Sequence, residues 1–145
     1  MRGLDRNNLG VFMRQYMAIG VAGLSGLLAS CATPPEQVAR ADYQTYCASC
    51  HGTDATGGGP LAKELDLNAP DLTRIAARNG GEFPTTRVMS VIDGYTRADQ
   101  HGSKMPEFGA LLEGKTVLVD YGDGVMTPTP APLVALAAYL EGLQG

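Results

Sequence analysis

Cys47-Ala48-Ser49-Cys50-His51 holds two of the three cysteines of this 145-residue chain and one of its two histidines. Two cysteines separated by two residues, with a histidine directly after the second, are typical of covalent haem attachment. Each thiol can add across one vinyl group of the porphyrin, and the intervening residues let one turn of chain span the two vinyls. His51 then lies beneath the iron, where its imidazole can bind as the proximal ligand. The motif therefore predicts one covalent haem c per chain, attached through Cys47 and Cys50.

Two other kinds of site use the same cysteine spacing. A thioredoxin-type redox pair usually follows a strand and opens a helix, whereas the residues before Cys47 have helical spacing. A zinc site needs a fourth ligand beyond the three of the motif. The candidates are His101, the other histidine, and Cys31, which belongs to a different motif. These alternatives, and chance occurrence of the motif in a structural loop, explain fewer features of the chain than haem does.

The composition suits a small domain wrapped around a cofactor. The counts of Gly 19 and Pro 9 predict long loops and few regular elements. Such a chain has little apolar material for a core of its own, and a large buried cofactor supplies what is missing. A formal net charge of −4 argues against nucleic acid as a partner.

The start of the chain has the layout of an export signal. Arg2, Arg6 and Arg14 form a basic region, and a stretch of small and apolar residues follows from 16 to 29. This stretch is short for a membrane-spanning helix, which needs about 20 residues. The segment could be cleaved at an ordinary small-residue site, or it could remain uncleaved as a marginal membrane anchor. Each of these possibilities places the domain outside the cytoplasm.

Leu28-Ala29-Ser30-Cys31 resembles the lipobox of bacterial lipoproteins, in which the cysteine is diacylated and becomes the new N-terminus. We therefore expect residues 1–30 to be a lipoprotein-type signal peptide, 31–37 a tether and 38–145 the monohaem domain. Cys31 is the expected lipid-attachment site, and two acyl chains suffice for stable membrane binding. The expected location is the periplasmic side of a bacterial membrane, or the soluble periplasm if Cys31 carries no lipid.

A glycine-rich loop follows the motif and ends at Gly59-Pro60. Iron-bound histidines usually donate their second ring nitrogen to a partner that fixes the ring. We expect a backbone carbonyl near Pro60 to be that acceptor for His51. The three glycines 57–59 would let the chain approach the porphyrin closely.

The remaining residues predict short helices separated by loops. A helix of about three turns, starting at Pro35, leads into Cys47. Hydrophobic spacing and capping residues predict further segments. They are short helical turns at 61–67, a helix at 72–77 capped by Asp71, a helix capped by Thr85 or Thr86 and closed by Gly94, a β-like patch at 116–119, an extended stretch at 126–132 and a C-terminal helix at 133–143.

Met105 lies in a polar, glycine-bearing loop, 95–110, outside any helical stripe. A thioether is a suitable sixth ligand for haem iron, and Met/His ligation raises the reduction potential. We therefore expect Met105 to bind the iron opposite His51. His101, Met126 and an open position are the alternatives, while Met89 falls on a helical stripe and is expected in the core.

With the haem motif, Gly59-Pro60, Met105-Pro106 and the terminal helix in this order, residues 36–145 resemble a class I c-type cytochrome. The resemblance implies a small all-α fold in which N- and C-terminal helices cross beside the haem. It implies His51 and Met105 as axial ligands, and Tyr43 packed inside near the crossing. Where relatives often carry glycine at the crossing, this chain offers Ala39 or Ala41.

The resemblance implies an electron carrier rather than an enzyme, because both axial positions of the iron are filled and no small-molecule substrate is needed. Its partners would be periplasmic or membrane redox proteins. One alternative is a cytochrome subunit of a larger periplasmic dehydrogenase or oxidase complex. Another is a haem-based sensor or enzyme in which a small ligand displaces Met105.

Overall fold

The structure is a computed structural model that describes residues 35–95 and 105–145. All of them belong to one compact unit, Thr33–Gly145. The predicted signal peptide with Cys31, and the alternative ligand His101, lie outside the described residues. Among the described helices, none has the length and apolar character needed to cross a membrane.

One continuous helical run carries the haem motif. It consists of α2 (Pro35–Asp42), the π-helical turn η1 (Tyr43–Cys47) and α3 (Ala48–His51). Pro35 occupies the first turn, where its missing N–H is no loss. Gly52, with φ 80, ends the run, because few other residues adopt such a backbone conformation. The predicted helix leading into Cys47 is confirmed, and its last turn is wider than an ordinary α-turn.

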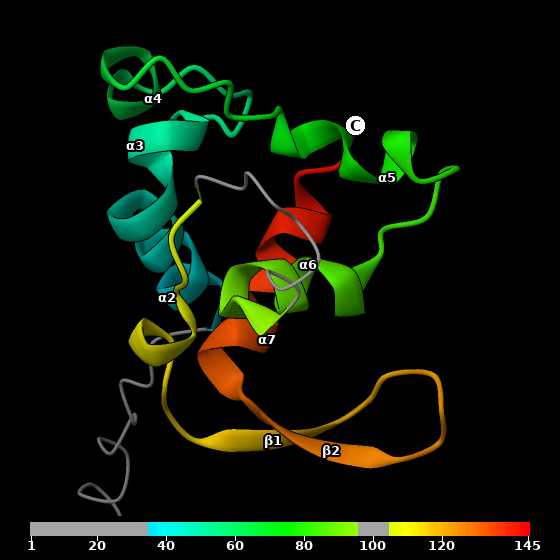
Figure 1. Ribbon diagram of the computed structural model, residues 1–145. Helices are drawn as coiled ribbons and strands as arrows, with labels where there is room; N and C mark the ends of the chain where they lie inside the picture. The colour runs from blue at the N-terminus through cyan, green and yellow to red at the C-terminus, as the bar shows by residue number, and fades with distance from the viewer. Residues whose placement is uncertain (1–34, 96–104) are drawn as a thin grey trace, which may run out of the picture. The chain divides into compact units, whose positions relative to one another are not determined.

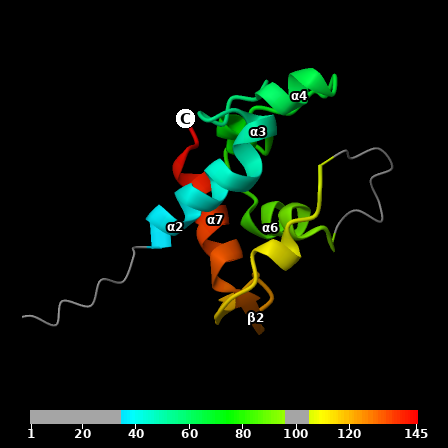
Figure 2. The ribbon, with the colours of Figure 1, turned by 90° about the vertical axis from the view of Figure 1, so that its left-hand side faces the viewer.

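The C-terminal helix α7 (Ala131–Gly142) packs across α2, as Figures 1 and 2 show. Ala39 is fully buried whereas Ala41 is exposed, so Ala39 stands at the crossing. Tyr43 is also fully buried, and its ring centroid lies 5.6 Å from that of Tyr139 on α7. The expected crossing of the two terminal helices around Tyr43 is therefore confirmed.

Short helices fill the middle of the chain. They are α4 (Pro60–Glu64), η2 (Leu72–Arg74), α5 (Ile75–Arg78), α6 (Thr85–Asp93) and η4 (Gly109–Leu111). The predicted cap is confirmed at Asp71, whose carboxylate accepts a 2.8 Å hydrogen bond from the Thr73 N–H. The predicted threonine cap of α6 is wrong, because Pro84 occupies the N-cap position and no side chain caps this helix. Gly94, with φ 100, closes α6 as expected.

A two-stranded antiparallel hairpin adds to the helices. It joins β1 (Thr116–Asp120) to β2 (Met126–Pro130). The sequence predicted both stretches as extended, but not their pairing. Figure 1 shows the hairpin at the lower edge of the view, directly before α7. The domain is therefore mostly helical, as predicted, with one small sheet.

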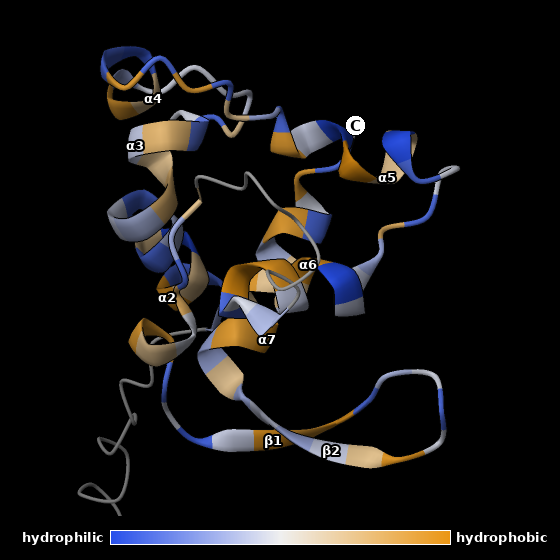
Figure 3. Ribbon diagram, viewed as in Figure 1, coloured by the Kyte–Doolittle hydropathy of each residue, from blue (hydrophilic) through white to orange (hydrophobic). Residues whose placement is uncertain are grey.

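The core lies where the motif-bearing run, α6 and α7 meet. α7 is rich in apolar residues, and Figure 3 shows orange along much of its visible side, which is typical of a helix largely covered by its neighbours. Its inner face packs against Tyr43 and against the apolar face of α6. The buried residues of this cluster include Tyr43, Val88, Met89, Ile92, Leu112, Leu133, Leu136, Ala137 and Leu140.

Candidate functional site

The two motif cysteines lie one helical turn apart, where side chains share a face of the helix. Cys47 is buried at 8% exposure, Cys50 is half-buried, and both are free thiols. Burial, followed by the nearby Asp42 and Cys50, raises the pKa of the Cys47 thiol to about 11. The helix thus places the two thiols of the motif one turn apart on one face, which is the spacing that addition to two vinyl groups requires.

His51 follows Cys50 at the end of α3, and its ring is buried at 8% exposure. Its Nδ1 lies 3.1 Å from the backbone carbonyl oxygen of Pro70. Because a carbonyl only accepts, Nδ1 must be the protonated nitrogen and donate this bond. Nε2 then carries the lone pair that a metal ligand needs. The orientation and the tautomer of the ring therefore fit iron binding through Nε2.

The prediction that a carbonyl near Pro60 would accept this bond is wrong. Pro60 begins α4 and is exposed, so its carbonyl enters the hydrogen-bonding ladder of that helix. The acceptor instead comes from Pro70, 19 residues after His51 in the chain. An exposed loop beyond α4 therefore supplies the partner that fixes the imidazole.

The loop 52–59 folds back on the motif and satisfies its carbonyl groups. The N–H of Gly57 donates to the His51 carbonyl at 2.8 Å, and the N–H of Gly59 donates to that of Cys50 at 2.9 Å. The buried Tyr43 hydroxyl donates to the Gly52 carbonyl at 2.7 Å. Burial, above all, raises the pKa of this hydroxyl beyond its usual range, so it stays protonated. These hydrogen bonds satisfy carbonyl groups at the C-terminal end of α3, which have no partner within the helix.

The glycines of this loop permit close approach of one stretch of chain to another. A Cβ at Gly57, where φ is +93, would overlap the Ala69 carbonyl, directly before Pro70. A Cβ at Gly59 would overlap the carbonyls of Ala48 and Ser49 on α3. The sequence predicted close approach to the porphyrin, whereas the contacts of these two glycines are with backbone. Gly57 thereby helps to place the carbonyl that holds His51.

Met105 is half-buried and packs against the apolar core. Three residues later, the ring of Phe108 lies 6.3 Å from that of Tyr46, the neighbour of Cys47. The Phe108 N–H donates to the Ile92 carbonyl of α6 at 2.9 Å. The segment after Met105 is therefore attached to the motif-bearing run and to α6 at once.

The alternative methionine ligands lie in different surroundings. Met89 is 3% exposed in the core, as predicted from its helical stripe. Met126 is 55% exposed at the end of the hairpin next to its turn. Within residues 35–95 and 105–145, no group of three or more His, Cys, Asp or Glu side chains is placed to hold a metal ion. The zinc alternative thus gains no ligand from this part of the chain.

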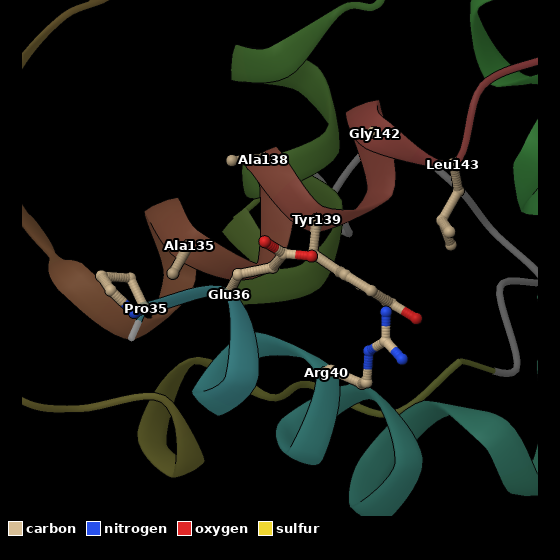
Figure 4. Close-up of a pocket in the computed structure, with 8 residues that line it drawn as sticks. All are labelled: Pro35, Glu36, Arg40, Ala135, Ala138, Tyr139, Gly142 and Leu143. Atoms are coloured by element: carbon tan, nitrogen blue, oxygen red, sulfur yellow. The ribbon is translucent and has the colours of Figure 1, made fainter. Parts of the chain in front are cut away.

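A separate groove of about 500 Å³ runs between α2 and α7. Figure 4 shows Arg40 of α2 extended toward Tyr139 of α7, with Glu36 beside them. None of the motif residues lines it. The groove therefore belongs to the helix crossing and not to the haem motif.

Crossed terminal helices, a pair of thiols one helical turn apart and a histidine held through Nδ1 together define a small c-type cytochrome domain. The comparison with protein families agrees: the chain belongs to the family described as cytochrome c oxidase, cbb3-type, subunit III, which it matches over residues 35–140. Comparison with curated proteins and with solved structures gives no match. The domain carries covalent haem c, transfers electrons to or from redox proteins and acts outside the cytoplasm.

Proposed function

We propose that this chain is a monohaem electron carrier whose iron is bound by His51 on one face and Met105 on the other. The observation that carries the proposal is the hydrogen bond from His51 Nδ1 to the Pro70 carbonyl. It fixes the one tautomer that leaves Nε2 available for iron, and such partners also raise the basicity of the ligand.

Met105 is favoured as the sixth ligand by its attachment and its burial. It is half-buried against the core, and the chain after it is held at Phe108 by Tyr46 and Ile92. These contacts would keep a weak thioether ligand in place, whereas Met126 is 55% exposed next to the hairpin turn. A thioether raises the reduction potential of the iron.

When bound, the haem supplies a one-electron couple between ferric and ferrous iron. The residues of the chain hold this couple in a constant environment. The core around Tyr43 and Leu136, both at most 1% exposed, excludes water from one side of the site. If His51 and Met105 hold the iron, they would leave no open position on it for a substrate.

The family supports a second candidate function. Its printed description is that of an oxidase subunit, so this chain is also proposed as a cytochrome subunit of a larger oxidase or dehydrogenase. Copurification of the native protein with a large partner would favour the subunit. For a mobile carrier, the acidic chain, with a formal charge of −4, should meet basic partner surfaces at rates that fall as salt rises.

We further propose that residues 1–30 are a lipoprotein signal, Cys31 the lipid-attachment site, 31–37 a tether and 38–145 the haem domain. The motif Leu28-Ala29-Ser30-Cys31 supports this organisation. Membrane fractionation of cells that express Cys31→Ser tests it. The variant should leave the membrane fraction, and unchanged retention would refute lipid attachment at Cys31.

The ligands are tested by absorption spectroscopy of the oxidised, haem-loaded protein. The methionine–iron charge-transfer band should disappear in Met105→Ala and persist in Met126→Ala, the matched control on an exposed methionine. Loss of the band in Met126→Ala with retention in Met105→Ala would assign the ligand to Met126. Haem that stays with the polypeptide after denaturation, and is lost in a Cys47→Ser/Cys50→Ser double variant, tests the attachment.

A further inference from the structure

The hairpin has two edges of different chemistry. The Ala131 N–H donates to the Lys115 carbonyl at 2.8 Å, and the ladder pairs Thr116 with Pro130 and Leu118 with Pro128. Hydrogen-bonded and non-hydrogen-bonded pairs alternate in an antiparallel ladder. Counting from the bonded pair at 115 and 131, the pairs that contain Thr116 and Leu118 are non-hydrogen-bonded. Backbone groups in these pairs point away from the partner strand.

The outer edge of β2 is closed to further strands by proline. Pro128 and Pro130 both fall at positions whose N–H would point outward, and proline has none to offer. Proline at an edge is one of the devices by which proteins prevent unwanted strand pairing. The chain therefore blocks β2 while keeping its ladder with β1 intact.

The outer edge of β1 has no such protection. Thr116, Leu118 and Asp120 direct their backbone N–H and C=O outward, and no other described residue bonds to these groups. The side chains are also accessible, with Val117 at 41% and Leu118 at 61% exposure. An apolar strand with an open edge is a template for an added strand.

We propose that β1 pairs antiparallel with β1 of a second copy of this chain, forming a four-stranded sheet across a two-fold axis at Leu118. In this register all five residues of the strand find a partner. Leu118 meets Leu118 of the other copy, Val117 meets Val119, and Thr116 meets Asp120. Apolar cross-strand pairs and a hydroxyl beside a carboxylate stabilise a sheet.

The composition of the strand favours a second copy over an unrelated strand. A two-fold interface is self-complementary, because each contact occurs twice. Thr116-Val117-Leu118-Val119-Asp120 carries a single charge, and the two-fold pairing places Asp120 opposite a neutral donor instead of another carboxylate. A contact of five residues is small compared with stable dimers, so the association is weak and reversible. The inference does not depend on which residues bind the iron.

Sedimentation equilibrium of the haem-loaded full chain tests the pairing, with Cys31→Ser in every sample so that no lipid contributes to association. Leu118→Pro removes one outward N–H and leaves the ladder intact, as the prolines of β2 do. It should weaken the dimer at least tenfold (an order-of-magnitude estimate for two lost hydrogen bonds in a symmetric pair). Met126→Pro is the control, because it removes an outward N–H from the other edge of the hairpin, at the pair with Asp120, and should leave the dimer unchanged.

Amide hydrogen exchange followed by NMR on the unmodified strand gives a second readout that does not need the proline variant to fold. As protein concentration rises, the amides of Thr116, Leu118 and Asp120 should gain protection. Those of Val117 and Val119, which already bond to β2, should not change. A monomer at all concentrations, a Leu118→Pro dimer as tight as the wild type, or equal weakening by Met126→Pro would each overturn the proposal.

Discussion

Substitution of Gly57 by alanine should weaken the domain through the carbonyl that orients His51. The backbone at Gly57 has φ +93, and an added Cβ would overlap the Ala69 carbonyl, which precedes the hydrogen-bond acceptor Pro70. The left-handed conformation alone costs an alanine about 1–2 kcal/mol. Displacement of packed backbone adds about 1–3 kcal/mol, and weakening of the His51–Pro70 bond adds about 1 kcal/mol.

Gly58→Ala is the matched control for this prediction. Gly58 has φ +64, but a Cβ there meets only the end of the Lys63 side chain at 3.7 Å. It carries the conformational cost without the overlap, so Gly57→Ala should be less stable than Gly58→Ala by about 2–4 kcal/mol. At roughly 4 °C per kcal/mol for a domain of this size, the Tm values should differ by on the order of 10 °C.

Thermal unfolding of the haem-loaded variants measures the difference, and a redox titration adds an independent readout. A weaker hydrogen bond from Nδ1 makes the imidazole a poorer donor to ferric iron, so the reduction potential should rise in Gly57→Ala and stay unchanged in Gly58→Ala. Equal Tm values and equal potentials for the two variants would refute the argument that Gly57 places the Pro70 carbonyl.

Three further substitutions test the packing, the buried hydroxyl and the acid response. Ala39→Leu overfills the helix crossing and should cost about 1–3 kcal/mol in denaturant unfolding, whereas Ala41→Leu on the exposed side should stay within about 0.5 kcal/mol of wild type. Tyr43→Phe removes the hydroxyl that donates to the Gly52 carbonyl and should lower the free energy of unfolding by about 1–3 kcal/mol. A Tm equal to that of the wild type would contradict this hydrogen bond. Hydrogen bonds from Thr73, chiefly from its hydroxyl, lower the pKa of Asp71. The ionised Asp71 carboxylate therefore stabilises the folded state fully above its unfolded pKa of about 3.9. This stabilisation is lost as pH falls through the lower folded pKa. Asp71→Asn, which cannot titrate, should flatten the Tm profile in this acid range, and an unchanged profile would exclude the contribution.

Local patterns predicted the elements that depend on local spacing. The helix before Cys47, the cap at Asp71, the closing Gly94 and the terminal helix all follow from residues within a few positions of one another. The burial of Tyr43 followed from the family resemblance, and the choice of Ala39 over Ala41 needed the structure, because both residues are small enough for the crossing.

The features that were missed depend on contacts between distant parts of the chain. The acceptor of His51 lies at Pro70, and its position is set by the fold of an irregular loop that leaves no periodic signal. The pairing of β1 with β2 joins two stretches that were visible only as extended. The absence of a threonine cap on α6 follows from the path of the chain through Pro84. The glycine with φ +93 at Gly57 was visible as a loop residue, but its neighbour Ala69 was not.

The central claim is that a covalent haem, filled on both axial faces by this chain, carries single electrons. Addition of carbon monoxide to the reduced, haem-loaded protein during a spectrophotometric redox titration tests it most directly. The wild type should give a reversible one-electron titration and no carbon monoxide adduct, whereas Met105→Ala should form the adduct rapidly. Rapid binding of carbon monoxide by the wild type would contradict the account and favour a sensor or enzyme with an open iron.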